Sequence, residues 1–126
     1  MLVFVYGTLK KNFDNHKILK KYSLHDTFLE VETVDKFQML ISTWGFPFVL
    51  KEPSNKFSEP LHLKGELWEI DDYLIEYLDA FEDVPTLYFR DTINVVFKNK
   101  IIKDVYIYFA SEIMNTYDNK CIKEFL

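Results

Sequence analysis

An uninterrupted apolar stretch near the N-terminus, residues 2–6, constrains the fold more than any other feature of the sequence. Five apolar or aromatic residues in a row are typical of a strand that is buried on both faces, so we expect a central strand here. Gly7 follows directly, and a glycine at the end of a strand stops it and permits backbone angles that other residues avoid. The sequence therefore predicts a central strand that ends abruptly in a loop.

This loop, with Tyr6, Gly7, Thr8 and Leu9, is a candidate anion site. The polar residues that follow it lead into a predicted helix, so several backbone N–H groups near Gly7 have no strand partner. Free N–H groups at a junction between a strand and a helix attract carboxylates and developing oxyanions. The alternative interpretation is that this glycine only makes a turn. The loop alone therefore does not establish a site, and further site residues must come from elsewhere in the chain.

The composition favours one folded unit. The chain has 126 residues, of which 48% are hydrophobic and 17% aromatic, and this is enough for one core. No repeat or proline-rich linker divides the sequence, so we expect a single domain over residues 1–126. The net charge of −5, without a basic stripe, argues against nucleic acid or an anionic membrane as a partner. No obligate protein partner is evident.

The cysteine and histidine residues predict no metal site. Cys121 is the only cysteine, which excludes an intramolecular disulfide and fits a reducing compartment. His16, His25 and His62 lack the spacing of metal ligands. The apolar stretch at the N-terminus is interrupted by Gly7 and is too short for a signal peptide or a membrane span. We therefore expect a cytoplasmic protein.

Alternation of apolar and polar residues predicts the remaining strands. Residues 27–33 alternate, and residues 37–41 are the expected partner strand of a hairpin. Alternation resumes over residues 61–70. The clearest hairpin joins residues 87–98 to residues 101–109.

Two helices are expected, over residues 12–22 and 73–81. Between the strands, residues 44–50 combine Gly45 and Pro47, which interrupt regular structure, with large apolar side chains, so we expect an ordered wall segment and not a free loop. The proline-bounded residues 53–60 predict a loop. The tail, residues 111–126, has weak helical character. It could close over a site or pack on the sheet.

The second helix carries the strongest candidate for catalysis. At the helical period, Leu74, Leu78 and Phe81 form an apolar stripe with Ile75 at its edge, and Glu82 projects between Leu78 and Ile75. A carboxyl group among apolar side chains should have a raised pKa, which suits a group that accepts and returns a proton. From this helix alone, a carboxylate with a purely structural role remains the alternative.

Arg90 is the only arginine in a chain with fourteen lysines. A site that needs a rigid, planar and permanently charged group is one reason to use arginine where lysine would not serve. An ordinary ion pair on a strand surface is the alternative interpretation.

Two segments together resemble the gamma-glutamyl cyclotransferase-like family. These are residues 3–11 and residues 78–90, and the second contains the pattern Phe-Glu-Asp-x-Pro-x-x-Tyr-x-Arg. Through this pattern and Asn15-His16, the match is closest to the gamma-glutamylamine cyclotransferase branch. The resemblance implies an α+β fold with a curved, barrel-like β-sheet and a few short helices. It also implies a small-molecule gamma-glutamyl substrate, no cofactor, and release of an amine as the glutamyl part closes into 5-oxoproline.

The resemblance also implies roles for individual residues. Glu82 matches the catalytic glutamate of the family, which carries the proton from the attacking α-amino group to the departing amine. The matching loop would bind the α-carboxylate and the oxyanion through the backbone N–H groups of Tyr6, Gly7, Thr8 and Leu9. Tyr88 could form a wall of the pocket, and Arg90 could brace the loop or the surroundings of Glu82.

Departures from the family pattern leave the substrate open. Asn12 stands where related sequences often have glycine, although asparagine can also adopt a left-handed turn. Residues 44–60 match only at Phe46-Pro47, which puts the identity of the leaving amine in doubt. Two alternatives therefore stand beside a gamma-glutamylamine cyclotransferase. One is an enzyme for gamma-glutamyl amino acids, and the other is a non-catalytic module that binds a small acid.

Overall fold

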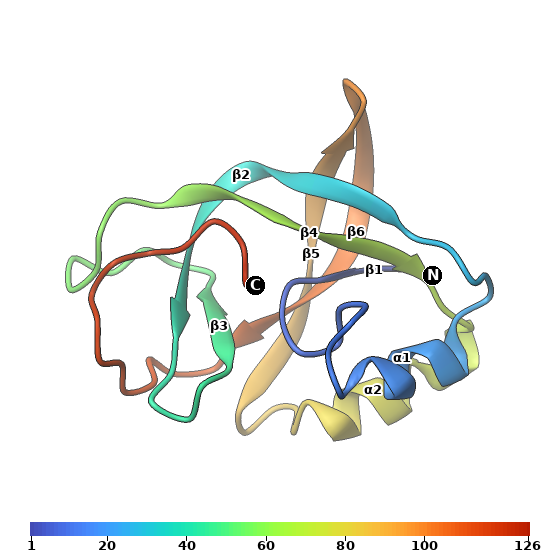
Figure 1. The fold of residues 1–126 in the computed structure, drawn as a ribbon, viewed down its shortest axis with the longest axis horizontal. Coiled ribbons are helices and arrows are strands. Elements are labelled where there is room, and N and C mark those ends of the chain that lie inside the picture. The colour runs from blue at the N-terminus through green and yellow to red at the C-terminus, as the bar shows by residue number, and fades with distance from the viewer.

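The structure, a computed structural model, describes residues 1–126 with the exception of the Leu74 side chain, and in it five strands close into a barrel (Figure 1). The strands of the sheet follow the order β3-β2-β4-β1-β6-β5, and a further pairing of β2 with β5 closes the ring. The strands are β1 (Leu2–Val5), β2 (Leu29–Ile41), β3 (Pro47–Leu50), β4 (Leu61–Glu69), β5 (Tyr88–Phe97) and β6 (Lys100–Ala110). The predicted α+β, barrel-like fold is confirmed.

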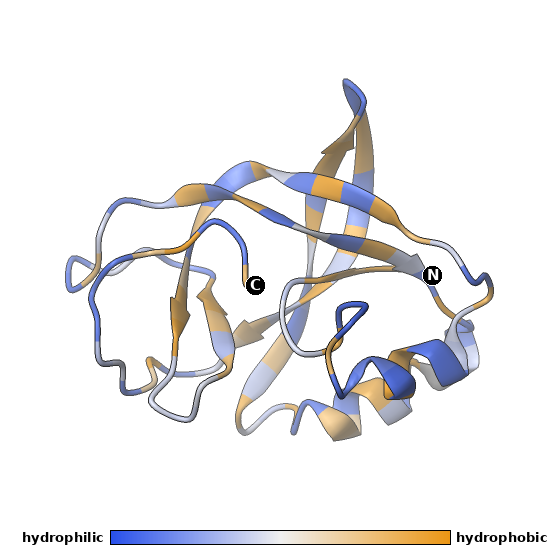
Figure 2. Cartoon of the chain, viewed as in Figure 1, coloured by the Kyte–Doolittle hydropathy of each residue, from blue (hydrophilic) through white to orange (hydrophobic). Residues whose placement is uncertain are grey.

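Strand β1 occupies the centre, as its sequence predicts. It pairs antiparallel with β4 and parallel with β6. Val3 and Val5 pack in the core cluster that the helices cover, whereas Phe4 lies in the second cluster with side chains from β2, β4, β5 and β6. Because both faces of β1 are buried, the strand is apolar throughout, whereas the half-exposed β2 alternates (Figure 2).

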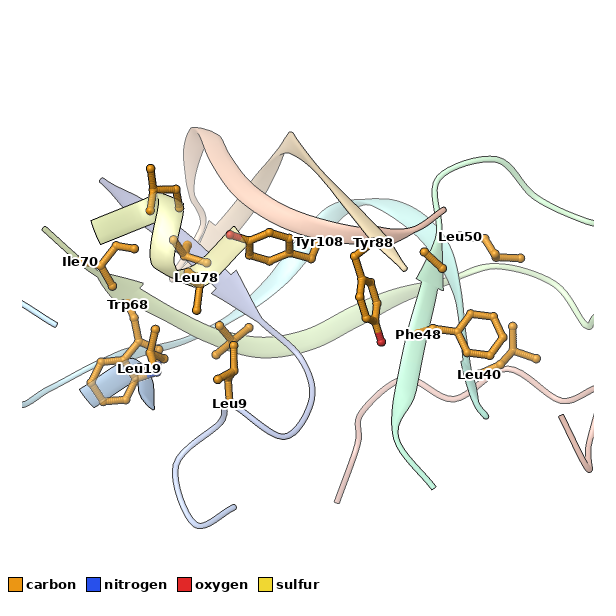
Figure 3. Packing of buried hydrophobic residues seen from close by; sticks show 14 of the residues in the cluster. Leu9, Leu19, Leu40, Phe48, Leu50, Trp68, Ile70, Leu78, Tyr88 and Tyr108 are labelled. Carbon is orange, nitrogen blue, oxygen red and sulfur yellow. The ribbon is translucent and has the colours of Figure 1, made fainter. Parts of the chain in front are cut away.

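Two short helical segments cover one side of the barrel. Helix α1 (His16–Tyr22) and helix α2 (Ile75–Phe81), which follows the 3-10 turn η1 (Asp72–Leu74), are held together by a stack of the Tyr22 and Tyr77 rings. Leu19 and Leu78 point from the helices into the core, together with Trp68 and Ile70 (Figure 3). In the predicted apolar stripe, the Leu74 side chain lies outside the described residues. Among the described residues, no helix is long and apolar enough to span a membrane.

Helix α1 starts later than predicted. Residues 10–15 form successive turns instead of helix, with the Phe13 N–H bonded to the Lys10 carbonyl at 3.2 Å. Asn12 has a φ of 79°, so it takes the left-handed conformation in place of a glycine, as predicted.

The predicted hairpin of residues 27–33 and 37–41 is wrong, because both segments belong to the single strand β2. Its pairing with β4 is irregular between Glu32 and Lys36. Thr33 stabilises the irregularity, since its hydroxyl donates to the Asp35 carbonyl at 2.6 Å and accepts from the Leu63 N–H at 2.9 Å. Residues 34–36 therefore bend the strand at a bulge and do not reverse it. Beyond the bend, β2 pairs with β3, which forms from the predicted wall segment.

The tail is extended and packs on the barrel, so the predicted helical character is wrong. Its backbone bonds to several parts of the sheet, with the Ile122 N–H donating to the Met39 carbonyl and the Lys123 carbonyl accepting from the Lys64 N–H, both at 2.9 Å. Of the two roles left open for the tail, the structure shows packing. The proline-bounded residues 53–60 form a loop, as predicted.

Candidate functional site

A pocket of about 210 Å³ opens where β1 ends. The loop after β1, the start of β3, the end of α2 and the segment before β5 converge on it, although they are far apart in the sequence. All predicted site residues except Arg90 line this pocket. The lining residues are Phe4, Val5, Tyr6, Gly7, Thr8, Leu9, Asn15, Phe46, Pro47, Phe81, Glu82, Leu87, Tyr88 and Tyr108.

The loop after β1 is held by bonds that leave its N–H groups available. The Gly7 carbonyl accepts from the Lys10 N–H at 3.0 Å, the Thr8 hydroxyl accepts from Asn15 Nδ2 at 3.0 Å, and the Leu9 carbonyl accepts from His16 Nδ1 at 2.9 Å. The backbone N–H groups of Gly7, Thr8 and Leu9 donate to no other group in the described part of the chain. These donors can therefore serve an anionic group in the pocket.

Gly7 is needed for a close approach and not for a special backbone angle. Its φ is not positive, so the expectation of angles forbidden to other residues is wrong, and the glycine with a left-handed φ is Gly45, at 91°. A Cβ atom at Gly7 would lie 2.9 Å from Cγ of Pro47. The absence of a side chain lets the loop pack against the first residue of β3, and both residues line the pocket.

Glu82 follows directly after α2 and presents its carboxyl group to the pocket. Its N–H bonds to the Leu78 carbonyl at 3.0 Å, so the helical path continues through this residue and fixes the direction of its side chain. The Glu82 carboxyl group makes no hydrogen bond or ion pair with any other described residue. Burial raises its pKa to about 7. Near neutral pH the group therefore exchanges readily between its protonated and ionised forms.

Three buried tyrosines form walls of the pocket. The Tyr6 hydroxyl donates to the Tyr108 carbonyl at 2.6 Å, and the Tyr88 hydroxyl donates to the Pro47 carbonyl at 3.2 Å. Tyr108 extends toward α2, and Tyr88 points away from it (Figure 3). Burial is the main cause that raises the pKa of each phenol, and the charge of Glu82 adds to it. These phenols therefore stay neutral and can donate, but they do not serve as bases.

Arg90 lies outside the pocket, and the ion-pair interpretation is the one that the structure supports. Its guanidinium lies 3.2 Å from Oδ2 of Asp79 and stacks 4.9 Å from the centre of the Tyr106 ring. Oδ1 of the same Asp79 accepts from the Tyr108 hydroxyl at 2.6 Å. Arg90 thus braces a wall of the pocket through Asp79 and does not reach the loop after β1.

Sequence reasoning missed several of these residues. It did not single out Asp79 or Tyr108, although Tyr108 lies two residues after Tyr106 in a predicted strand, on the same face as Tyr106. Phe81 was predicted as part of an apolar stripe; it is 40% exposed and lines the pocket, as does Leu87, which is 38% exposed. Among the described residues, no group of three or more His, Cys, Asp or Glu side chains is placed to hold a metal ion.

The family model and two relatives that match this chain carry gamma-glutamyl cyclotransferase or gamma-glutamylaminecyclotransferase names. The family model described as gamma-glutamyl cyclotransferase, AIG2-like, matches residues 3–124. A Drosophila melanogaster protein provisionally named a gamma-glutamylcyclotransferase is 34% identical over 98% of this chain and 76% of its own length. Gamma-glutamylaminecyclotransferase A of Danio rerio is 36% identical over 80% of this chain, and the match covers 60% of the zebrafish protein.

A solved structure shares the fold over nearly the whole chain. The crystal structure of an AIG2-like protein from Mus musculus superimposes with a TM-score of 0.81 at 25% identity, and the match covers 98% of this chain and 86% of the mouse protein. Together with the match of the family model over residues 3–124, this similarity assigns the chain. It belongs to the gamma-glutamyl cyclotransferase, AIG2-like family.

Proposed function

We propose that the protein is a gamma-glutamylamine cyclotransferase, which converts a gamma-glutamyl amine such as side-chain-linked gamma-glutamyl-lysine into 5-oxoproline and the free amine. One observation carries the proposal. A carboxyl group with a pKa of about 7, that of Glu82, shares a small pocket with a loop whose Gly7, Thr8 and Leu9 N–H groups have no internal partner among the described residues. Intramolecular transfer of an acyl group needs a proton carrier and an anion site in this arrangement.

In the proposed reaction, the α-amino nitrogen of the substrate attacks its own γ-carbonyl carbon. Glu82 accepts a proton from this nitrogen, the new C–N bond closes the ring, and the carbonyl oxygen becomes an oxyanion. As the oxyanion collapses, the amide C–N bond breaks, and Glu82 returns the proton to the departing amine. The proton leaves and returns on one carboxyl group, so the reaction balances without a cofactor.

The loop after β1 supplies the electrostatic part of this mechanism. Its free N–H groups would hold the substrate α-carboxylate and stabilise the oxyanion, and losing one donor of this kind typically costs about 2.7–4 kcal/mol of barrier. The pocket also keeps the substrate folded on itself. Because attack is intramolecular, correct positioning can lower the barrier by about 7–11 kcal/mol in favourable cases.

The names of the relatives support two substrate classes. The zebrafish relative is named for gamma-glutamyl amines, whereas the name of the fly relative mentions only the gamma-glutamyl group. An enzyme for gamma-glutamyl amino acids is therefore the second candidate. Both candidates use the same groups and differ in what the leaving nitrogen carries.

The test measures 5-oxoproline by mass spectrometry after incubation with side-chain-linked gamma-glutamyl-lysine, gamma-glutamyl-alanine or glutathione. We expect product from the lysine conjugate, and a loss of about 10²- to 10⁴-fold in the Glu82→Gln variant. Glu76→Gln is the matched control, because Glu76 is exposed on α2, the helix that directly precedes Glu82, and lines no part of the pocket. Product from gamma-glutamyl-alanine alone would favour the second candidate, and a folded protein that forms no 5-oxoproline from any of the three would contradict both.

A further inference from the structure

The pocket differs between its floor and its mouth. Tyr6 and Tyr108 on the floor are at most 7% exposed, whereas Phe81 and Leu87 are about two-fifths exposed. Phe46, which is partly buried, joins these two residues in the lining. We call Phe46, Phe81 and Leu87 the apolar mouth.

A bound gamma-glutamyl amide would have its leaving amine at this mouth. The α-amino group and the γ-carbonyl must both reach Glu82 and the loop after β1. The glutamyl part therefore fills the inner pocket, and the chain on the amide nitrogen extends outward past the apolar mouth. A chain that covers these exposed side chains removes apolar surface from water, which favours binding.

The charges of the pocket oppose an ionised group at the same place. Among the described residues that line it, none is lysine, arginine or histidine, and Glu82 is the one carboxylic acid. A charged group held against the apolar mouth would lose water without gaining an ion partner. A carboxylate there would also be repelled whenever Glu82 is ionised.

We propose that the apolar mouth selects leaving amines with an uncharged, apolar chain, so that gamma-glutamyl alkylamines are better substrates than side-chain-linked gamma-glutamyl-lysine. The inference rests on the proposed cyclotransferase function and narrows its substrate class. The lysine conjugate can still react, because its methylene stem passes the mouth and its charged end stays in water. The charged end, however, limits how much of the chain can pack against the apolar mouth.

The test compares four gamma-glutamyl conjugates that share one carbon chain and differ in its far end. Pentylamine ends without charge, cadaverine ends in an ammonium group, aminocaproic acid ends in a carboxylate, and side-chain-linked lysine carries both charges. We expect kcat/KM to be about tenfold higher for the pentylamine conjugate than for the lysine conjugate, and lowest for the aminocaproic conjugate.

Variants test whether the apolar mouth causes the preference for an uncharged leaving amine. Leu87→Lys places a cation at the mouth, so it should raise kcat/KM for the aminocaproic conjugate relative to the pentylamine conjugate by about tenfold or more. Ile101→Lys is the matched control, since Ile101 is 58% exposed on β6 and does not line the pocket. It should leave the ratio unchanged. Circular dichroism and thermal unfolding show whether each variant is folded.

Three results would overturn the inference. Equal or faster turnover of the lysine conjugate would overturn it and leave the proposed function standing, as would an unchanged ratio in folded Leu87→Lys. If no conjugate is turned over, the proposed function fails, and calorimetric titration of the four conjugates into Glu82→Gln decides the inference separately. Tighter binding of the pentylamine conjugate would support a selective mouth, and equal or absent binding would overturn it.

Discussion

The Tyr108 hydroxyl donates a 2.6 Å hydrogen bond to Oδ1 of Asp79, and this bond joins the β6 wall of the pocket to helix α2. Arg90 on β5 approaches the other oxygen of the same carboxylate at 3.2 Å. Asp79 also precedes Glu82 by one helical turn. One carboxylate thus connects β5, β6 and the helix that delivers Glu82, which gives the pocket a rigid side.

The first prediction concerns the stability contributed by Asp79. In Asp79→Ala both partners lose their acceptor, and we expect the free energy of unfolding to fall by about 2–3 kcal/mol, because hydrogen bonds to charged groups contribute about 1.5–3 kcal/mol. Asp79→Asn keeps an oxygen for Tyr108 and loses only the ion pair with Arg90. We expect a loss of about 1 kcal/mol there, since this pair is partly exposed.

Urea unfolding of Asp79→Ala, Tyr108→Phe and the double variant measures how far the two side chains are coupled. We expect a coupling energy of about 1 kcal/mol, because the residues are in direct contact. Additive losses would contradict a functioning hydrogen bond between Asp79 and Tyr108.

The connection through Asp79 could not be predicted from the sequence because it depends on a shift in strand register. Alternation predicts the hairpin of β5 and β6, and the structure confirms it. From its turn, the hairpin pairs Phe97 with Lys100 and Val95 with Ile102. Continued without a break, this register would place Arg90 opposite Ile107.

An irregularity between Ile93 and Val95 shifts the pairing by one residue, so that Arg90 lies opposite Tyr108. Because side chains alternate between the faces of a sheet, a shift of one residue decides which side chains meet. Local patterns predict strands well, but they do not predict a bulge that tertiary packing imposes. The same reason explains why residues 34–36 were predicted as a turn.

The loop after β1 gives the second prediction. An alanine at Gly7 would bring its Cβ to 2.9 Å from Cγ of Pro47, which is buried and has a rigid ring. We expect Gly7→Ala to lower the free energy of unfolding by about 1–3 kcal/mol, as overpacked sites do, and to reduce 5-oxoproline formation because the loop must move. Thermal unfolding and the product assay measure the two effects.

A second substitution tests the cause of the Gly7 effect. Pro47→Ala removes the Cγ and Cδ atoms, so the double variant Gly7→Ala, Pro47→Ala should regain part of the stability that Gly7→Ala loses. Failure of this rescue would show that contact with Pro47 is not the reason for glycine at this position.

The position of a candidate site residue can be predicted from the sequence where its own helix or strand fixes it. Glu82 was placed by the period of one helix, and the loop after β1 by the end of one strand. Phe46 and Leu87 are different, because each lies in an irregular segment, and only the closed barrel brings these segments to the end of β1. Periodicity and turn signals do not predict such a convergence, and for Phe46 only the family resemblance, which matches at Phe46-Pro47, points to the site.

The last prediction follows from the pKa of Glu82. Burial raises this pKa from the ordinary value of 4.5 to about 7 in the folded protein. Between these two values the unfolded chain loses the proton of this group while the folded protein still holds it, so deprotonation favours unfolding. The stability that the neutral carboxyl group contributes is therefore complete below about pH 4.5 and is lost as the pH rises through 7. Chemical unfolding between pH 4 and 8 should show a loss of about 3 kcal/mol attributable to this group, from about 1.4 kcal/mol for each pKa unit.

Glu82→Gln isolates this contribution from those of other carboxyl groups. Asp91 is one of these: Lys51 lowers its pKa, so the stability that it contributes is lost as the pH falls and not as it rises. Glutamine does not titrate, so the difference in unfolding free energy between wild type and Glu82→Gln should change between pH 4 and 8. As the pH rises, the unfolding free energy of the wild type should fall relative to that of the variant. A difference that stays constant from pH 4 to 8 would mean that Glu82 titrates alike in the folded and unfolded states. Its carboxyl group would then lack the raised pKa on which its proposed role as a proton carrier near neutral pH depends.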